Sequence, residues 1–283
     1  MAKEEKKSTS TDVATQKAGG AVAGFDYGER AGEGFEGTTS DDLSIPFLSI
    51  LQSNSPQIVD EDPAGAKAGM LFNTVTRELF NSDNGLIVIP VHKDMAFVEW
   101  VPRGEGDGSG GGFVGLHVPD SDVVKAAIEA NGGSRIGKLK LENKNELVET
   151  HYVYCLILDA EGKTSEGFAV LSFTSTKIKP QRDWFTAMYT IKGRPPLYAN
   201  RAVMRTVKQE NKHGKFFNFR IDPFGATWKD SLIDPSTSAD LLNEAVSFRK
   251  MVTSGMAKAA HDTERAATGT GKGTGEDGEE PPF

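Results

Sequence analysis

The sequence predicts a mainly β protein of the α+β class, built on an antiparallel sheet or a small barrel with a few short helices. Apolar segments of strand length occur in neighbouring pairs joined by short polar turns, as in hairpins. No regular helical crossover separates them, which argues against a doubly wound α/β sheet. The two ends, residues 1–40 and 263–283, carry too few large apolar side chains to offset the entropy lost on folding, so we expect both to be disordered.

The chain of 283 residues is therefore expected to divide into four parts. These are a disordered N-terminal arm at residues 1–40, a folded domain at 41–235, a C-terminal helix at 236–262 and a disordered acidic tail at 263–283. We find no internal repeat in the sequence that would divide the folded part further.

The first half of the folded domain is predicted to consist of strands. Residues 47–52 are expected to form a short strand or a turn of helix, and residues 69–80 a strand, a turn and a second strand. The continuous apolar run at 85–91 is typical of a buried strand. Residues 95–101 follow it after the short polar segment HKD, so the two are expected to pair as a hairpin.

A glycine-rich loop at 103–115 precedes a short helix that Asp120 or Ser121 can cap. The apolar stripe of this helix consists of Val123, Val124, Ala127 and Ile128. Two further strands are expected at 146–158 and 167–176, joined by the turn DAEGK.

The last part of the folded region is predicted to hold two helices around a hairpin. Pro180 suits the first residue of a helix that runs through Ile191, with Trp184, Met188 and Ile191 on one face. A hairpin is expected from 197–208 and 216–221. A final helix at about 238–260 would begin with a capping box formed by Thr237 and Asp240, and its apolar stripe consists of Leu241, Leu242, Ala245, Val246 and Phe248.

The sequence lacks the patterns of common enzyme sites. Gly106, Gly108 and Gly111 satisfy GxGxxG, but more glycine and FVGLHVP follow where a dinucleotide site needs a helix. The five histidines show no metal-ligand spacing such as HExxH, and there is no GxSxG and no phosphate-binding GxxxxGK[ST]. We expect no enzyme, no cofactor and no metal.

The single cysteine, Cys155, excludes an internal disulfide, and the flanking run YVYCLIL predicts a buried, inert thiol. No apolar run reaches the roughly 18 residues that a membrane-spanning helix needs. The lysines near the N-terminus are not followed by the apolar core of a signal peptide. We therefore expect a soluble protein of a reducing intracellular compartment.

Positive charge is concentrated in one window of an acidic chain. The net charge is −8, but residues 172–220 contain eleven Lys or Arg and only two acids, Asp183 and Glu210. The window carries +9 and leaves −17 for the rest. Eight aromatics are interleaved with these cations: Phe173, Trp184, Phe185, Tyr189, Tyr198, Phe216, Phe217 and Phe219. Cations that meet phosphates beside aromatic faces that stack on bases are typical of single-stranded nucleic-acid binding.

Strand alternation divides the segment KFFNFRID into two faces. The face expected in the core consists of Phe217, Phe219 and Ile221, and the face that suits a nucleic acid consists of Phe216, Asn218 and Arg220. Trp184 is expected to pack into the core. The alternative is that the aromatics are core residues and the cations are only solvated. The residues that we expect to contact DNA are Lys177, Lys179, Arg182, Tyr198, Arg201, Arg205, Lys215, Phe216 and Arg220.

These features, together with the terminal sequence EDGEEPPF, resemble the single-stranded DNA-binding proteins. The tail is similar to the bacterial form, which ends in aspartates and Ile-Pro-Phe, and to the T-odd phage form, an OB-fold protein whose acidic tail closes on an aromatic. It differs from the bacterial form in having Glu for Asp, and Pro281 for Ile. The segments IPFLSILQSNSP, GGGF, LSFTSTKIK and KGRPPLYANR resemble phage-encoded proteins of this group over most of residues 41–225.

The resemblance implies an elaborated OB-like antiparallel barrel with extra material at 103–145. It also implies a protein that binds and protects single-stranded DNA, without sequence specificity, during phage DNA replication or recombination in the cytoplasm of a bacterial host. A homo-oligomer is left open. The tail would compete with DNA for the basic groove and recruit a polymerase, helicase or nuclease through Glu276, Asp277, Glu279, Glu280 and Phe283.

Two other functions stay open. A phage structural or assembly protein would use the acidic tail for solubility and the basic face for a protein partner. A strand-annealing recombination protein would form rings or filaments on DNA.

Overall fold

The computed structural model describes residues 33–34, 36–37, 44–102, 112–135, 137–211, 214–256 and 258–261. The chain divides into two units, residues 1–38 and 39–283. In the first unit, the described residues form turns in which the Glu36 carboxylate accepts hydrogen bonds from the Gly34 N–H. The sheets and helices lie in the second unit. The expected disordered tail at 263–283 and the GxGxxG glycines lie outside the described residues.

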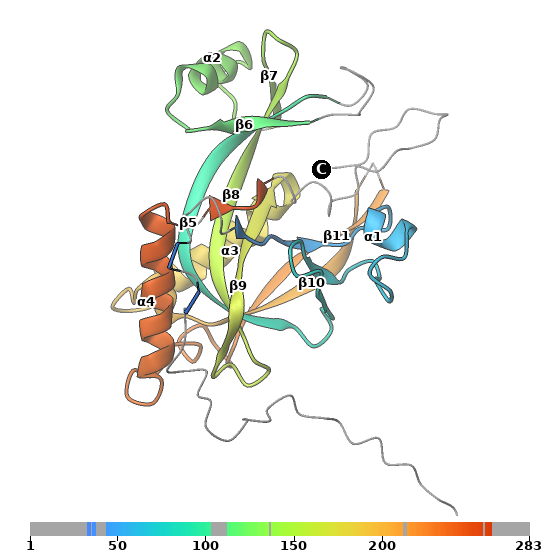
Figure 1. Ribbon diagram of the computed structural model, residues 1–283. Helices are drawn as coiled ribbons and strands as arrows, with labels where there is room; N and C mark the ends of the chain where they lie inside the picture. Colours follow the sequence, from blue (N-terminus) through green and yellow to red (C-terminus); the bar gives the residue numbers. More distant parts are fainter. Residues whose placement is uncertain are drawn as a thin grey trace, which may run out of the picture. The chain divides into compact units, whose positions relative to one another are not determined.

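Two long antiparallel strands, β5 (Leu86–Trp100) and β8 (Glu146–Leu158), form the centre of the main sheet. They pair from Val88 opposite Ile157 to Trp100 opposite Glu146. The other strands of this sheet are β6 (Phe113–His117), β7 (Lys138–Lys140), β9 (Ser165–Thr174), β10 (Ala202–Asn211) and β11 (Gly214–Pro223). Among the described residues the order is β11-β10-β5-β8-β7, with β6 paired to β5 and β9 paired to β8 (Figure 1).

β5 is one continuous strand where the sequence analysis predicts a hairpin, so that prediction is wrong. The polar residues His92, Lys93 and Asp94 continue the strand and pair with residues 152–154 of β8. Because β8 offers a partner along this whole stretch, no turn is needed. The strand instead shifts register through a bulge between Pro90 and His92, which suits a proline that has no N–H to donate.

Most other predicted elements are confirmed within a few residues. The strand predicted at 146–158 is β8, the strand predicted at 167–176 is β9, and the hairpin predicted from 197–208 and 216–221 supplies β10 and β11. Residues 47–52 contain β2 (Leu48–Ile50), and residues 69–80 contain β3 (Leu71–Asn73) and β4 (Leu79–Phe80). The sequence does not predict α1 (Pro56–Val59), β6, β7 or the parallel pair β1 (Ser44–Ile45) and β12 (Lys258–Ala259). Two predicted bounds are wrong: β6 begins at Phe113 inside the predicted loop at 103–115, and the helix predicted at about 238–260 ends at Thr253.

One face of the β5–β8 pair packs against α4 (Ala239–Thr253). This face carries Ile87, Ile89 and Val91 from β5, which meet Leu241, Ala245 and Phe248 of the helix in one buried cluster. Three buried residues at i, i+4 and i+7 form the apolar stripe that the sequence predicts.

The predicted capping box of α4 is wrong. The helix begins after Ser238, whose side chain makes no capping hydrogen bond. Thr237 instead belongs to the preceding turn, where its hydroxyl donates to the carbonyl of Asp234 at 3.4 Å. Because Ser238 N–H also donates to the Asp234 carbonyl at 3.0 Å, this turn holds residues 234–238 outside the helix.

The other face of the β5–β8 pair packs against α3 (Ile178–Tyr189) and the small sheet β2-β3-β4. Val153, Cys155 and Ile157 of β8 point into this second cluster, and Trp184 of α3 is only 2 % exposed there. Both faces of β8 are therefore buried, which explains its nearly unbroken apolar sequence. Burial raises the pKa of the Cys155 thiol, in agreement with the predicted inert cysteine.

The predicted β-rich antiparallel class is confirmed, but the strands in the described residues form no closed barrel. Two gaps between the small sheet and the main sheet are bridged by a few contacts and no ladder of paired strands. Phe47 forms an isolated parallel bridge with Val170 of β9. At the other gap, the Gln52 side chain donates from Nε2 to the Phe217 carbonyl at 2.9 Å and accepts from the Phe217 N–H at 2.8 Å. One side-chain amide thus replaces a strand ladder beside β11.

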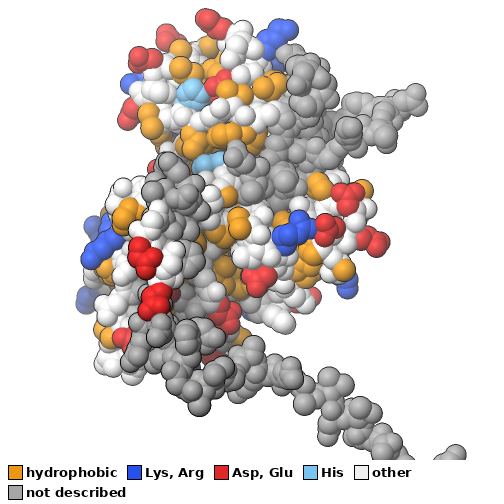
Figure 2. Space-filling model, in the orientation of Figure 1, with side chains coloured by type: hydrophobic (Ala, Val, Ile, Leu, Met, Phe, Trp, Pro, Cys, Tyr) orange, Lys and Arg blue, Asp and Glu red, His pale blue; other side chains and the backbone are white. Residues whose placement is uncertain are grey.

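The far ends of β5 and β8 carry a small subdomain, which we call the tip, with β6, β7 and α2 (Asp122–Ala130) (Figure 1). Ser121 caps α2, as predicted, by accepting from the Val124 N–H at 3.4 Å. The tip has a buried apolar cluster of its own, which includes Phe97, Val124 and Leu139. In Figure 2 the tip shows both acidic and basic side chains together with exposed apolar ones.

None of the helices in the described ranges has the length and apolar character needed to cross a membrane.

A buried carboxylate links the strands of the tip. Glu99, 7 % exposed, lies 2.6 Å from Nε2 of His117, and it accepts hydrogen bonds from Asn145 at 2.5 Å and Asn143 at 3.2 Å. Burial opposes ionisation of Glu99, but these hydrogen bonds outweigh burial and lower its pKa.

The change Glu99→Gln should reduce the free energy of unfolding by about 1.5–3 kcal/mol near neutral pH, because hydrogen bonds to a charge become weaker. The folded-state pKa lies below the ordinary value of 4.5, so this contribution is complete above that value and is lost as the pH falls through the folded pKa. Urea unfolding should therefore show a difference between wild type and variant that shrinks in acid. The exposed Glu142→Gln serves as control. A difference that is constant with pH would contradict this assignment.

Candidate nucleic-acid interface

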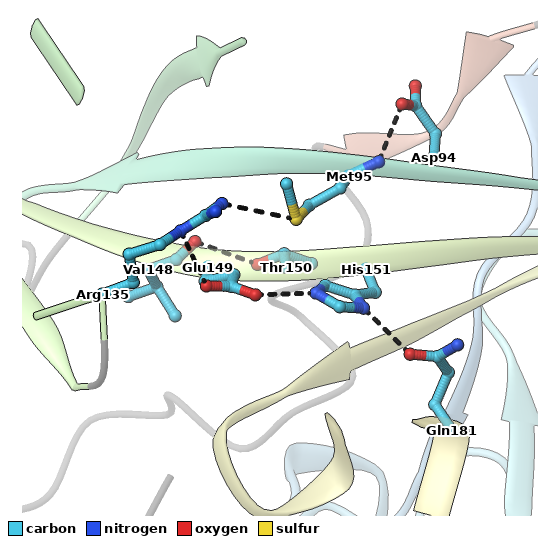
Figure 3. A network of polar contacts seen from close by, with 8 residues as sticks. All are labelled: Asp94, Met95, Arg135, Val148, Glu149, Thr150, His151 and Gln181. Atoms are coloured by element: carbon cyan, nitrogen blue, oxygen red, sulfur yellow. Dashed lines mark hydrogen bonds and ion pairs between the residues drawn. The ribbon is translucent and has the colours of Figure 1, made fainter. Parts of the chain in front are cut away.

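The basic window begins where β9 ends and continues into η1 (Ser175–Lys177) and α3. Trp184 and Met188 fix α3 by packing into the core. A polar chain fixes its first half: Nδ1 of His151 lies 2.9 Å from Oε1 of Gln181, and Nε2 lies 2.8 Å from Oε1 of Glu149. Figure 3 shows these contacts running from Arg135 through Glu149 to α3. The helix that carries Lys179 and Arg182 is thus held against β8.

A second polar contact joins η1 to β11. Asn218, 2 % exposed, donates from Nδ2 to the Thr176 carbonyl at 3.2 Å and to Oε1 of Gln209 at 3.0 Å. Its own Oδ1 accepts from the Phe219 N–H at 2.8 Å. The expectation that Asn218 faces a nucleic acid is therefore wrong, because its side chain is buried and its amide makes hydrogen bonds within the protein, including the one that holds β11 to η1.

The apolar face of β11 is confirmed. Phe219 is buried, and Phe217 and Ile221 are partly buried against the same cluster. Phe219 also lies against Phe173, with ring centroids 5.0 Å apart. These rings connect the ribbon of β10 and β11 to the core behind α3.

Between α3 and the ribbon lies a cleft of about 310 Å³, which we call the α3–β11 groove. It is lined by Pro180, Asp183, Trp184, Val207, Phe219, Arg220, Ile221 and Trp228. Most of this lining is apolar or aromatic. The indole Nε1 of Trp184 is buried and has no hydrogen-bond partner in the described residues, so a donor without an acceptor lies in the wall of the groove.

Four of the residues that the sequence predicts to contact DNA lie at this groove or on the elements beside it. Lys177 Nζ lies 5.9 Å from the centroid of the Phe219 ring, and Arg220 lines the groove itself. Arg205 is opposite Arg220 in the ladder, and both guanidinium groups pair with Asp222, at 3.0 and 3.1 Å. Lys179 pairs with the groove residue Asp183 at 2.6 Å.

Three further predicted contacts lie near but not in the groove. Arg182 is exposed on α3, three positions after Lys179 and therefore on the same side of the helix. Lys215 is exposed, and Phe216 is partly buried at the turn end of the ribbon. Lys215 lies five positions before Arg220, which is about 17 Å along a strand. A strand of DNA bound in the groove would contact Lys215 and Phe216 only if it also followed β10 and β11 to their turn.

The structure separates Arg201 and Tyr198 from the groove. Arg201 donates to the carbonyls of Gly162 at 3.1 Å and Leu232 at 3.4 Å, and its guanidinium lies 4.3 Å from the centroid of the Phe224 ring. Burial lowers its pKa. Its role is to tie two loops together, which sequence position alone does not reveal. Tyr198 lies in η2 (Leu197–Ala199) and lines a different pocket.

Trp228, Tyr189 and Arg194 are not among the residues that the sequence predicts to contact DNA. Trp228 lies eight residues beyond the basic window but lines the groove. Tyr189, 63 % exposed at the end of α3, has the Arg194 guanidinium 4.6 Å from its ring centroid. In the sequence, an aromatic residue two positions before the segment IKGR was the signal that could have indicated this cation–π pair.

The predicted partner-binding residues Glu276, Asp277, Glu279, Glu280 and Phe283 lie outside the described residues.

A family model described as Pam3 phage gp34-like protein matches residues 14–258, a range that includes α3, β10 and β11. No curated protein and no solved structure matches the chain.

The change Asn218→Ala should lower the free energy of unfolding by about 1–3 kcal/mol, because it removes the hydrogen bonds that the buried Asn218 side chain donates to the Thr176 carbonyl and to Gln209. Amide hydrogen exchange should rise in residues 175–180, where η1 loses its tie to β11. The exposed Lys215→Ala on the same strand is the control and should change stability by less than about 0.5 kcal/mol. Equal stability of the two variants would show that Asn218 does not hold η1.

Proposed function

The chain belongs to the Pam3 phage gp34-like protein family, and on that premise we propose that it is a phage protein that binds single-stranded DNA without sequence specificity. Its role would be to protect unpaired strands in the host cell during phage DNA replication or recombination. The observation that carries this proposal is the α3–β11 groove, which combines an aromatic lining with cations on both of the elements that form it.

The lining of the groove suits unpaired bases. Trp228 is partly exposed in its lining, whereas Trp184 and Phe219 are each only 2 % exposed. Stacking of a base on Trp228 would contribute about 1–3 kcal/mol. A base enters such a groove only when it is out of a duplex, which favours single strands over double-stranded DNA.

The charges around the groove suit the phosphates. Lys177 and Lys179 lie on the η1–α3 side, and Arg205 and Arg220 lie on the ribbon. Asp183 pairs with Lys179, and Asp222 contacts both guanidinium groups, so the four cations named here exceed these two acids by two charges. Each Lys or Arg that neutralises a phosphate releases a counterion condensed on the DNA and so adds to the affinity, so binding should weaken steeply with salt. Since this interaction does not depend on base identity, it supports binding without sequence preference.

We extend the proposal to the acidic tail. Residues 276–280 carry carboxylates that can compete with phosphates for the same cations, so the tail would occupy the groove when DNA is absent. A bound strand would displace it and leave Phe283 free for a polymerase, helicase or nuclease. The two prolines before Phe283 would keep the end of the tail extended.

The alternatives differ in what they do with DNA. Titration of labelled oligo-dT and of a duplex of equal length, at two salt concentrations, separates them. A structural or assembly protein would bind neither or both equally. A strand-annealing protein would bind the single strand and also accelerate pairing of complementary strands.

The change Arg220→Ala should weaken oligo-dT binding about fivefold or more at low salt, because it removes a phosphate contact at the groove. The slope of log K against log salt should become shallower by about 0.7, the value for one contact on a single strand. The matched control is Lys125→Ala on α2, which removes an exposed cation from the tip. Equal effects of the two variants would place the DNA elsewhere.

Deletion of residues 275–283 should tighten oligo-dT binding at low salt, and the gain should disappear at high salt, where screening removes the competition. A full-length variant with the four tail carboxylates changed to amides should behave like the deletion, because it keeps the length and loses the charge. Unchanged or weaker binding in both variants would contradict competition between tail and DNA.

A further inference from the structure

The exposed side of α3 leads from the α3–β11 groove to a second aromatic side chain. The exposed residues of this helix recur every three or four positions and form one stripe along it, which consists of Lys179, Arg182, Asp183, Thr186 and Tyr189. Lys179 lies beside the groove, because it pairs with the groove residue Asp183. Tyr189 lies at the other end of the stripe, about 15 Å away along the helix axis. The stripe therefore connects the groove with the C-terminal end of α3.

Tyr189 is an aromatic residue that the fold leaves in solvent. It is 63 % exposed, the largest value for any Phe, Tyr or Trp in the described part of the chain. Phe168 comes next at 42 %, but its ring stacks on Phe248 of α4, with centroids 5.1 Å apart. Tyr189 belongs to none of the buried clusters. Its ring is therefore available to a flat ligand, and an unpaired base is one that stacks on such a ring.

The turn that follows α3 holds Arg194 over this ring. The Arg194 N–H donates to the Ile191 carbonyl at 3.0 Å and closes the turn. Gly193 and Arg194 have positive φ angles of 88° and 45°. This conformation suits glycine but is unfavourable for arginine, and more so before Pro195, because a residue that precedes proline prefers an extended backbone. Strained positions of this kind cluster at binding sites, which indicates a role for the arginine side chain.

The Arg194 guanidinium is positioned but not neutralised. Its Cζ lies 4.6 Å from the centroid of the Tyr189 ring, as in a cation–π contact. Within the described ranges, its side chain forms no ion pair and donates no hydrogen bond, and the exposed Arg182 and Lys192 have no acid partner. The sequence between Asp183 and Glu210 contains no Asp or Glu. The five N–H donors of Arg194 are therefore available to an anion beside the ring.

We propose that Tyr189 and Arg194 form a second contact for single-stranded DNA, in which an unpaired base stacks on Tyr189 and the adjoining phosphate binds Arg194. This inference rests on the proposed single-strand function. It extends the bound strand from the groove, along the exposed stripe of α3, to the end of the helix. Arg182 lies on this path and would contact a phosphate. A base in a duplex is stacked between its neighbours and cannot reach the ring, so the contact favours unpaired strands.

The first test removes the ring. Tyr189→Ala should weaken binding of oligo-dT to the full-length protein about fivefold or more, which corresponds to the loss of one stacked base. Tyr189→Phe keeps the ring and should bind like wild type. Thr186→Ala, on the same exposed stripe, is the matched control and should leave the affinity unchanged. In wild type, oligo-dT that carries 5-iododeoxyuridine should form a photo-cross-link to Tyr189, detected by mass spectrometry of the peptides.

The second test, Arg194→Gly, separates a binding role from a structural one. Glycine suits a φ of 45°, so the variant should unfold at the same temperature as wild type or at a higher one. Its affinity for oligo-dT should nevertheless fall, and the slope of log K against log salt should become shallower by about 0.7. Lys163→Ala removes an exposed cation from the turn between β8 and β9 and should leave the slope unchanged.

The outcomes distinguish this inference from the proposed function. Oligo-dT binding that Arg220→Ala weakens, but Tyr189→Ala and Arg194→Gly do not, would overturn the inference and leave the proposed function standing. A lower melting temperature of Arg194→Gly with unchanged affinity would show that the pair only stabilises the end of α3, and would also overturn it. Absence of oligo-dT binding in wild type would instead refute the proposed single-strand function, and this inference with it.

Discussion

The antiparallel pairing of β5 with β8 is the interaction on which the rest of the structure depends. The ladder runs from Val88 and Ile157 to Trp100 and Glu146, and both of its faces are covered. One face organises α4, and the other organises α3 and the small sheet. The far end carries the tip. Because α3 packs on this ladder through Trp184 and Met188, the ladder also sets where α3 forms its side of the α3–β11 groove.

The incomplete closure of the sheets shapes the candidate interface. β11 has no backbone partner on its outer side among the described residues, and the Gln52 amide takes that place at a single point. The rest of the ribbon stays free to meet η1 and α3 through Asn218 and through Phe219. A fully paired β11 would fill this space with another strand. The open edge therefore leaves room for the groove, and the cations follow because β11 and α3 lie in the basic window.

Local sequence patterns predicted those features that depend on local physics. Apolar runs located β8 and the strands around it, and the Ser121 cap located α2. The predictions from these patterns were wrong where the structure of a segment depends on residues far away in the sequence. His92, Lys93 and Asp94 have the polarity of a turn but stay extended because β8 pairs with them. Within the site, Arg201 and Asn218 looked like surface groups because their partners at Gly162 and Thr176 are 39 and 42 residues away in the sequence.

If a single strand of DNA lies along α3 and β11 as proposed, hydrogen exchange of the full-length protein should detect it. Saturating oligo-dT should add protection in residues 175–189 and 214–228, and a duplex of equal length should add none. Protection confined to other segments, such as the tip at 112–140, or equal protection by the duplex, would contradict it.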